Sequence, residues 1–172
     1  SPHFLFNSFN TLTNLIEENR ENAIDYTTHL SDLYRYILAY PDRDLIVLYE
    51  ECEILNNYIY IQKSRFGDAL KVQMDIPEYV LQSKRIIPLA LQLLVENAIK
   101  HNVVSTSQPL VISIIANETE IVVRNPIHPK ISKEKKSGLG LVNIVKRYKL
   151  LTDRPITYGA ENNDYVVKLP LL

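Results

Sequence analysis

The chain has 172 residues, of which 46% are hydrophobic and 23% charged, a composition typical of a globular protein that buries a core. Its formal net charge of −1 excludes the strongly basic surface of most nucleic-acid-binding domains, so no direct nucleic-acid binding is expected. Cys52 is the single cysteine and cannot form an internal disulfide, and no apolar run reaches the ~18 residues that cross a bilayer.

Two amphipathic helices are predicted at the start of the chain. Ser1 can cap the first helix and Pro2 suits its first turn, and an apolar stripe follows at helical spacing, made of Leu5, Phe9, Leu12 and Ile16. His3 lies on another face, where we expect it to be exposed. A polar break at residues 17–22 precedes a second stripe, formed by Ala23, Tyr26, Leu30, Leu33 and Ile37.

The two stripes have a consequence for assembly. Two such helices leave apolar surface uncovered, and a four-helix bundle built by two copies of the chain would cover it. We therefore expect a homodimer, with residues 1–40 as the dimerisation domain.

Residues 41–44 are the expected boundary to a second domain, which spans residues 41–172. Helices are predicted at residues 48–66, 88–101 and 140–151, and strands at residues 70–76, 111–115, 121–123, 156–158 and 165–169. A mobile loop is expected at residues 126–137. Because helices and antiparallel strands segregate, the predicted fold class is α+β, with a two-layer sandwich in the second domain.

The helix predicted at residues 88–101 carries an unusual group of polar side chains. Asn97 precedes Lys100 by three residues and His101 by four, so all three project from neighbouring parts of one surface, next to Glu96. An amide oxygen is a suitable ligand for Mg²⁺ that already holds phosphates and water, and Lys100 could contact a phosphate. Taken alone, the pattern favours a solvated helix face with an ion pair between Glu96 and Lys100.

A glycine-rich turn precedes the helix predicted at residues 140–151. The free N–H groups and the dipole of a helix start favour an anion, so Gly138 and Gly140 could cradle a phosphate. A loop-to-helix transition also needs glycine for purely conformational reasons. The basic residues before the turn are interpreted as a solvated loop, and they are Lys133, Lys135 and Lys136.

The remaining candidate for chemistry is a histidine. His29 is interpreted as a surface residue, and His128, between two prolines, has no evident partner. No convergent set of Cys, His and carboxylate residues predicts a metal centre, and no Ser-His-Asp arrangement is present. His3 is thus the candidate nucleophile, on a turn that faces solvent.

These motifs resemble, in order, those of the LytS-type sensor histidine kinases. The segment PHFLFNSFN at residues 2–10 is similar to the histidine motif NPHFLFN of that family, and the helix at residues 48–66 is similar to its next helix. The segment LQLLVENA at residues 91–98 resembles the family's N-box. The segment GLGLVNI at residues 138–144, with Arg147, resembles its glycine box.

The resemblance implies a Bergerat-type ATP-binding fold, as in gyrase and MutL, behind a helical hairpin. It implies that His3 accepts the γ-phosphate of ATP and that Asn97 holds Mg²⁺, and Glu96 is expected to serve as a base through a water. The residues expected to contact the nucleotide are Asn97, Lys100, His101, Asn125, Gly138, Leu139, Gly140, Leu141 and Asn143.

The resemblance also implies partners and a location. The phosphate would pass to an aspartate of a response regulator, expected to be of the LytTR type. The sequence lacks an initiator methionine and opens on a helix start, so we expect a fragment. The resemblance implies that this fragment is the cytoplasmic part of a bacterial inner-membrane protein, attached to the membrane only through a segment upstream.

The chain departs from the family's motifs at three places. Ser1 stands where the family has Asn, and no acidic residue follows His3. Asn125 and Ile127 replace the Asp and Gly of an Asp-x-Gly motif, whose carboxylate accepts a hydrogen bond from the adenine amine. A poorer hydrogen bond costs roughly 0.5–1.5 kcal/mol, about tenfold in affinity.

Two alternative functions follow from these departures and from the fold. The first is a degenerate signalling module that keeps the fold and the dimer but binds ATP weakly or not at all. The second is an ATPase of the gyrase or MutL kind, which needs a glutamate four residues before the magnesium asparagine. Leu93 occupies that position, so the second alternative is disfavoured.

Overall fold

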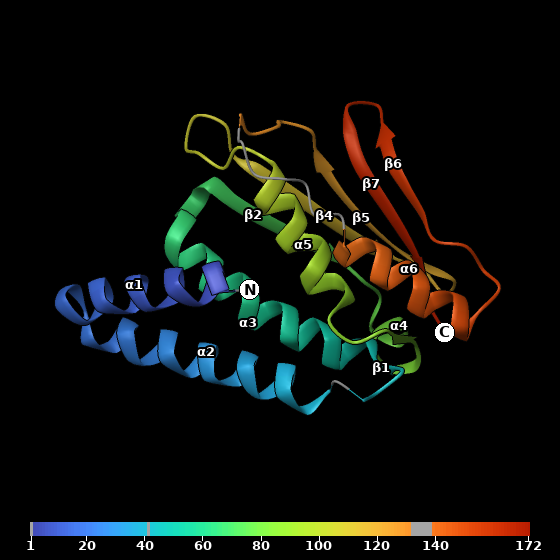
Figure 1. Cartoon of the computed structure of the whole chain (residues 1–172), viewed down its shortest axis with the longest axis horizontal. Helices are drawn as coiled ribbons and strands as arrows, with labels where there is room; N and C mark the ends of the chain where they lie inside the picture. The colour runs from blue at the N-terminus through green and yellow to red at the C-terminus, as the bar shows by residue number, and fades with distance from the viewer. Residues whose placement is uncertain (1, 41, 132–138) are drawn as a thin grey trace.

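A computed structural model describes residues 2–40, 42–131 and 139–172, and Figure 1 shows a helical hairpin packed beside a unit in which helices cover a sheet. Ser1, Lys133, Lys135, Lys136 and Gly138 lie outside the described residues, so the expectations attached to them are not addressed by the structure. Among the described helices, none is both long and apolar enough to span a membrane.

The hairpin consists of α1 (Pro2–Glu18) and α2 (Arg20–Ala39), which run side by side in Figure 1. Only Asn19 separates them: its backbone is extended and its side-chain oxygen accepts a hydrogen bond from the backbone N–H of Asn22 at 3.1 Å. The predicted break at residues 17–22 was therefore wrong in extent, because a single N-cap residue suffices to end one helix and start the next.

The two predicted apolar stripes fare differently. In α2 the stripe is confirmed, since four of its members are buried, namely Ala23, Tyr26, Leu30 and Leu33. In α1, Leu12 packs against the core, whereas Phe9 is 52% and Ile16 63% exposed. Half of the α1 stripe thus faces away from its own chain.

Helix α3 (Leu48–Phe66) lies between the hairpin and the sheet, and it ends, as predicted, at Gly67, whose φ is +55°. A 3-10 turn, η1 (Gly67–Ala69), leads into the first long strand. Helix α3 contacts both α2 and α5, so it forms the centre of the helical part.

The interpretation of His29 as a surface residue was wrong. Its ring is half-buried and stacks on Tyr60 of α3, with ring centroids 3.9 Å apart, and its Nδ1 lies 2.7 Å from the side-chain oxygen of Asn57. Helical spacing placed His29 beside the buried stripe of α2, but it could not show that α3 covers that edge. His29 therefore contributes to the interface between the hairpin and α3.

A five-stranded sheet forms the second layer, in the order β2 (Leu70–Asp75), β4 (Leu110–Ala116), β5 (Glu120–Pro126), β7 (Asp164–Pro170) and β6 (Thr157–Glu161). The β2–β4 pair is parallel and the other pairs are antiparallel. Helices α5 (Ala90–His101) and α6 (Leu139–Leu151) lie over one face (Figure 1). The predicted α+β two-layer sandwich is confirmed.

The strands predicted at residues 111–115 and 121–123 pair with each other, as do those predicted at residues 156–158 and 165–169, and local turn chemistry explains both pairs. Between β4 and β5, the side-chain oxygen of Asn117 accepts hydrogen bonds from the backbone N–H groups of Thr119 and Glu120, at 2.8 and 3.0 Å. Between β6 and β7, Asn162 and Asn163 have φ values of +50° and +67°, as two-residue hairpin turns require.

Three short elements were not predicted. Helix α4 (Glu78–Ser83) and the two-residue strands β1 (Ile46–Val47) and β3 (Arg85–Ile86) form a small addition beside the start of α3. Elements this short contain less than two periods of a helix or strand, so periodicity cannot detect them.

Candidate functional site

The polar side chains predicted to share one face of α5 are accessible. Glu96 and Asn97 are half-buried, whereas Lys100 and His101 are exposed. The side-chain nitrogen of Gln92 lies 3.5 Å from a carboxylate oxygen of Glu96. Glu96 and Lys100 do not form the ion pair that a purely solvated helix face would favour. The ion pairs among the described residues are formed by other side chains, namely Asp32, Arg35, Arg124, Glu161 and Asp164.

The first turn of α6 lies against α5. A Cβ placed on Gly140 would be 2.8 Å from Cδ2 of Leu93, so only glycine lets the two helices approach this closely without moving that side chain. Leu93 and Asn97 are four residues apart and lie on the same face of α5. The start of α6, where backbone N–H groups have no partners within the helix, therefore lies against a residue one helical turn before Asn97.

The other residues expected at the α6 motif lie as follows. Leu139 is the first residue of α6, Leu141 packs against the core, and Asn143 is exposed. Gly140 lies inside the helix, so its role in packing against Leu93 takes the place of the conformational role that the sequence suggested.

Asn125 lies in β5, where it is 5% exposed and faces the same side of the sheet as the buried Ile121 and Val123. Its side-chain nitrogen donates a hydrogen bond to the carbonyl of Pro126 at 2.9 Å. This bond orients the amide and leaves its oxygen as the acceptor that could meet a ligand.

The segment after β5 is anchored on the C-terminal end of α5. The buried side chain of Asn102 donates to the carbonyl of Ala98 at 2.9 Å and accepts from the backbone N–H of His128 at 2.8 Å. The ammonium group of Lys130 donates to the carbonyl of Ile99 at 2.9 Å, at the negative end of the helix dipole. Residues 127–131, expected to begin a mobile loop, are thus tied to α5.

His3 is exposed on the first turn of α1, as predicted. The side-chain nitrogen of Asn7, one turn later, lies 3.2 Å from its Nδ1, which leaves Nε2 facing away from this contact. The next residue, Phe4, packs on Tyr58 of α3, with ring centroids 5.6 Å apart. The contacts that position His3 therefore lead to α3 rather than to α5.

Our interpretation of the sequence did not single out Glu51 of α3, which contacts the start of α5. Its side chain is fully buried, and its two carboxylate oxygens accept hydrogen bonds from the backbone N–H groups of Leu89 and Leu91, each at 2.8 Å. Burial raises the pKa of Glu51 to about 7, while these hydrogen bonds and the charge of Arg147 oppose the increase. The sequence did contain a signal, because Leu48, Leu55 and Tyr58 stand at helical spacing from Glu51 and are apolar or aromatic. The structure shows that all three are buried.

The residues around Asn97 could hold a metal ion only together with a bound ligand that supplies further oxygen atoms. In the part of the chain that the structure describes, no group of three His, Cys, Asp or Glu side chains could hold a metal ion. Mg²⁺ commonly takes one or two protein oxygens and completes its shell with phosphates and water. The oxygen of Asn97, one turn after the residue that contacts the start of α6, fits that second mode.

Three comparisons, two of sequence and one of structure, show which known proteins the chain is similar to. The family model for histidine kinases matches residues 1–70. Sensor histidine kinase YpdA of Escherichia coli (strain K12) is 34% identical over 164 residues, which cover 88% of this chain and 29% of that protein. Sensor protein LytS of Oceanobacillus iheyensis is 27% identical over 184 residues, which cover 95% of this chain and 31% of that protein.

The fold also matches a solved structure. The cytoplasmic segment of histidine kinase QseC aligns with a TM-score of 0.51 at 21% identity, over 87% of this chain and 94% of that one. This similarity concerns the fold alone. The chain spans less than a third of the length of the two sensor proteins.

Proposed function

Because the chain belongs to the LytS-type sensor histidine kinases, we propose that it binds ATP between α5 and α6 and transfers the γ-phosphate to His3. The chain would supply the kinase core of a longer sensor protein. The proposal concerns the activity of that whole protein, of which this chain is a part.

The observation that carries the proposal is the contact between Gly140 and Leu93. It brings the N–H groups at the start of α6 against a residue one helical turn before Asn97. Helix starts favour phosphates, and a neutral amide oxygen is a ligand that Mg²⁺ accepts. The exposed Lys100, one turn after Glu96, adds a positive charge at the same face. When bound, Mg²⁺ would neutralise charge on the phosphates.

Transfer would form a bond between a ring nitrogen of His3 and the γ-phosphorus, while the bond to the bridging oxygen breaks and ADP leaves. Asn7 occupies Nδ1, so Nε2 is the nitrogen open to the phosphate. Nε2 can attack only through a free lone pair, so the neutral ring must react as the tautomer that carries its proton on Nδ1, next to the side-chain amide of Asn7. That proton leaves once the new bond has formed. We propose Glu96, through a water, as the base.

Nucleotide contacts are proposed for the remaining residues at this junction. The backbone of Gly138, Leu139, Gly140 and Leu141 would meet the phosphates, and His101 and Asn143 would border them. The oxygen of Asn125, oriented by its bond to Pro126, would accept from the adenine amine. These assignments rest on the family's motifs and, for every residue except Gly138, on the positions described above.

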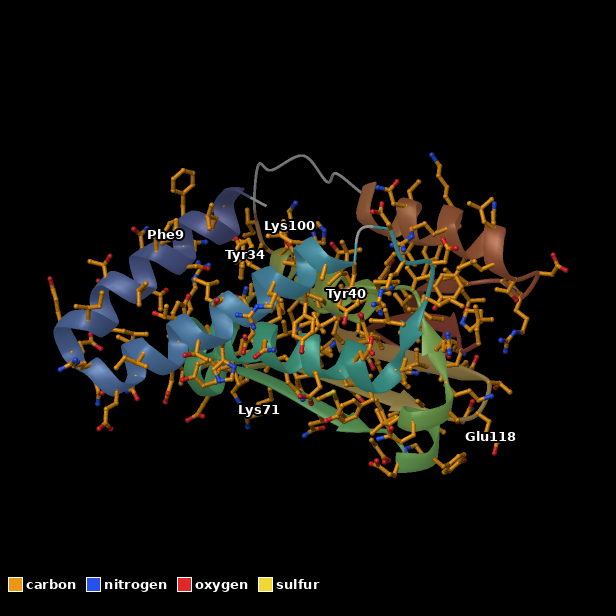
Figure 2. All side chains as sticks on the ribbon, turned by 90° about the horizontal axis from the view of Figure 1, so that it is seen from below. Phe9, Tyr34, Tyr40, Lys71, Lys100 and Glu118 are labelled. Carbon is orange, nitrogen blue, oxygen red and sulfur yellow. The ribbon has the colours of Figure 1, made fainter. Side chains whose placement is uncertain are left out.

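We further propose that the chain acts as a homodimer through residues 1–40 and passes its phosphate to an aspartate of a response regulator, of the LytTR type. Exposed apolar side chains on the hairpin support the dimer, and Figure 2 shows Phe9 projecting away from the rest of the chain. A groove of ≈ 750 Å³ between α1 and α2 is lined in part by Leu12, Ile16 and Ile24. In the sensor protein, the segment would lie on the cytoplasmic side of the membrane.

One observation favours a second candidate, the non-catalytic signalling module. Asn125 is neutral where the family has a carboxylate, and its amide nitrogen is already committed to Pro126. A weak adenine contact would leave a module that dimerises and signals without turnover.

Titration calorimetry of a Mg-ATP analogue into the chain separates the two candidates, with Asn97→Ala as the control variant. We expect binding in the micromolar to sub-millimolar range that weakens at least tenfold in Asn97→Ala. With ATP, acid-labile phosphate should then form in the wild type and not in His3→Gln, which keeps its nucleotide binding. A folded wild type that binds no nucleotide would support the non-catalytic module instead.

A further inference from the structure

The start of α5 has no cap of its own. The residue at the N-cap position, Leu89, has a φ of +65° and a side chain that cannot accept a hydrogen bond. Left-handed backbone is uncommon for a residue other than glycine, so the surrounding structure must hold it there. Of the first N–H groups, that of Ala90 donates to the nearby carbonyl of Ile87 at 3.3 Å, whereas those of Leu89 and Leu91 need a partner from elsewhere.

Glu51 supplies the missing cap from another helix. Its carboxylate reaches across 38 residues of sequence to Leu89 and 40 to Leu91, and each of its oxygens takes one N–H group. It is the only acidic side chain that is buried in the described part of the chain. Burying a carboxylate costs several kcal/mol unless hydrogen bonds compensate, so the two bonds and the position of Glu51 depend on each other.

The helix that carries Glu51 also holds the hairpin. Tyr58, seven residues after Glu51 and thus on a similar face of α3, packs on Phe4 beside His3. Asn57 and Tyr60 hold His29 of α2. Helix α3 therefore contacts the segment that presents His3 at one end and the start of the helix that carries Asn97 at the other.

We propose that Glu51 is a positioning residue for α5: by capping this helix from α3, it sets where Asn97 stands relative to the hairpin that carries His3. The inference rests on the proposed function and extends it to a residue outside the nucleotide site. Asn97 lies six residues beyond Leu91, which is less than two helical turns. A shift in the position of the start of α5 should therefore move Asn97 as well.

The test compares Glu51→Gln with Glu53→Gln, a matched change at an exposed position of the same helix. Glutamine keeps the size of Glu51 and one acceptor oxygen, but it presents an NH₂ group where the second oxygen stood. We expect Glu51→Gln to raise the dissociation constant for the Mg-ATP analogue about tenfold, with Glu53→Gln within about twofold of the wild type.

A second readout needs no nucleotide. Amide hydrogen exchange should accelerate in Glu51→Gln through the whole of α5, including residues 95–101, and stay unchanged in Glu53→Gln. Acceleration confined to residues 89–92, or none, would overturn the positioning role even if the cap is real. Should Glu51→Gln fail to fold, Glu51→Asp serves, because it retains both oxygens on a stem that is shorter by one methylene.

The pH profile distinguishes positioning from simple destabilisation. The titratable groups that interact electrostatically with Glu51 are Arg147 and Tyr148 of α6 and Cys52 of α3, and the N–H groups of α5 surround its carboxylate. Protonation of Glu51 removes one acceptor, so nucleotide affinity of the wild type should fall between pH 8 and pH 6 more than that of Glu51→Gln. Equal profiles would overturn the proposal. A wild type that binds no nucleotide would refute the proposed function, while hydrogen exchange would still decide the role of Glu51.

Discussion

The side chain of Asn125 is held by a hydrogen bond that a carboxylate could not make. Its amide nitrogen donates to the carbonyl of Pro126, and the residue is almost fully buried. An aspartate here would place two acceptors against each other in a poorly solvated position. The departure from the family's motif is therefore accommodated by the local structure of the strand.

Replacing Asn125 by Asp should accordingly have two opposite effects. The free energy of unfolding should fall by about 1–3 kcal/mol, because the Pro126 carbonyl loses its donor and a charge is buried. Nucleotide affinity should rise by up to about tenfold, since a carboxylate accepts more strongly from the adenine amine. Denaturant unfolding and calorimetry measure the two effects, with the exposed Asn56→Asp as control. Unchanged stability would show that the Pro126 bond contributes nothing.

At the level of residues, motifs located the candidate site better than they explained it. Asn97 and Gly140 were both singled out from sequence, yet the contact of Gly140 with Leu93 depends on how two distant segments pack. Glu51 was missed because two adjacent glutamates in a helix suggest a solvated face. Which of them is buried depends on the start of α5, some 40 residues away in sequence.

Among the elements, the hairpin of α1 and α2 leaves the most apolar surface uncovered. Phe6 of α1 is 67% and Ile24 of α2 54% exposed, in addition to the exposed Phe9 and Ile16 of α1. Large apolar patches on otherwise ordinary surfaces mark interaction sites. Since the long helices were predicted from their periodicity alone, the sequence already contained this surplus of apolar surface.

Phe9→Glu should therefore disrupt the proposed dimer without unfolding the chain. A charge at the centre of a helix bundle interface would be buried without a partner, so the dissociation constant of the dimer should rise by at least about a hundredfold. Sedimentation velocity at matched concentrations measures the change, with the exposed Glu17→Gln on the same helix as control. A wild-type chain that sediments as a monomer would argue against the dimer itself.

The features that could not be predicted from the sequence are those that depend on pairing between distant strands. Helices of 12 or more residues and both hairpins follow from periodicity and turn residues. The parallel pairing of β2 with β4 and the two-residue strands β1 and β3 depend on contacts between distant segments. The extent of the break at Asn19 also escaped prediction, because one capping residue hardly alters the local composition.

For the molecule as a whole, the buried Glu51 makes stability depend on pH. Its pKa in the folded chain is raised to about 7, above its ordinary value, so the folded state binds this proton more tightly than the unfolded chain does. The stability that it contributes is present at low pH and is lost as pH rises through about 7.

Between pH 5 and pH 8, the free energy of unfolding should thus fall by about 2–3 kcal/mol from this group. The Glu51→Gln variant should lack that decrease, and urea unfolding at several pH values measures the difference. This trend is opposite in sign to the expected gain of nucleotide affinity with rising pH. If stability and affinity rise and fall together, the assignment of both trends to Glu51 is wrong.

The parallel pair of β2 and β4 also affects the order in which the chain can fold. It joins residues 40 positions apart, such as Leu70 and Leu110, whereas the β4–β5 hairpin joins Ser113 to Arg124. Closing the larger loop costs more chain entropy, so the hairpins should form early and β2 should dock late. Helix α5 lies inside the loop that this docking closes. The β5–β7 pair faces a similar cost, since it joins residues 38 to 50 positions apart, such as Pro126 with Asp164 and Glu120 with Pro170. The segment that bears Asn97 therefore reaches its final place only after the hairpins have formed.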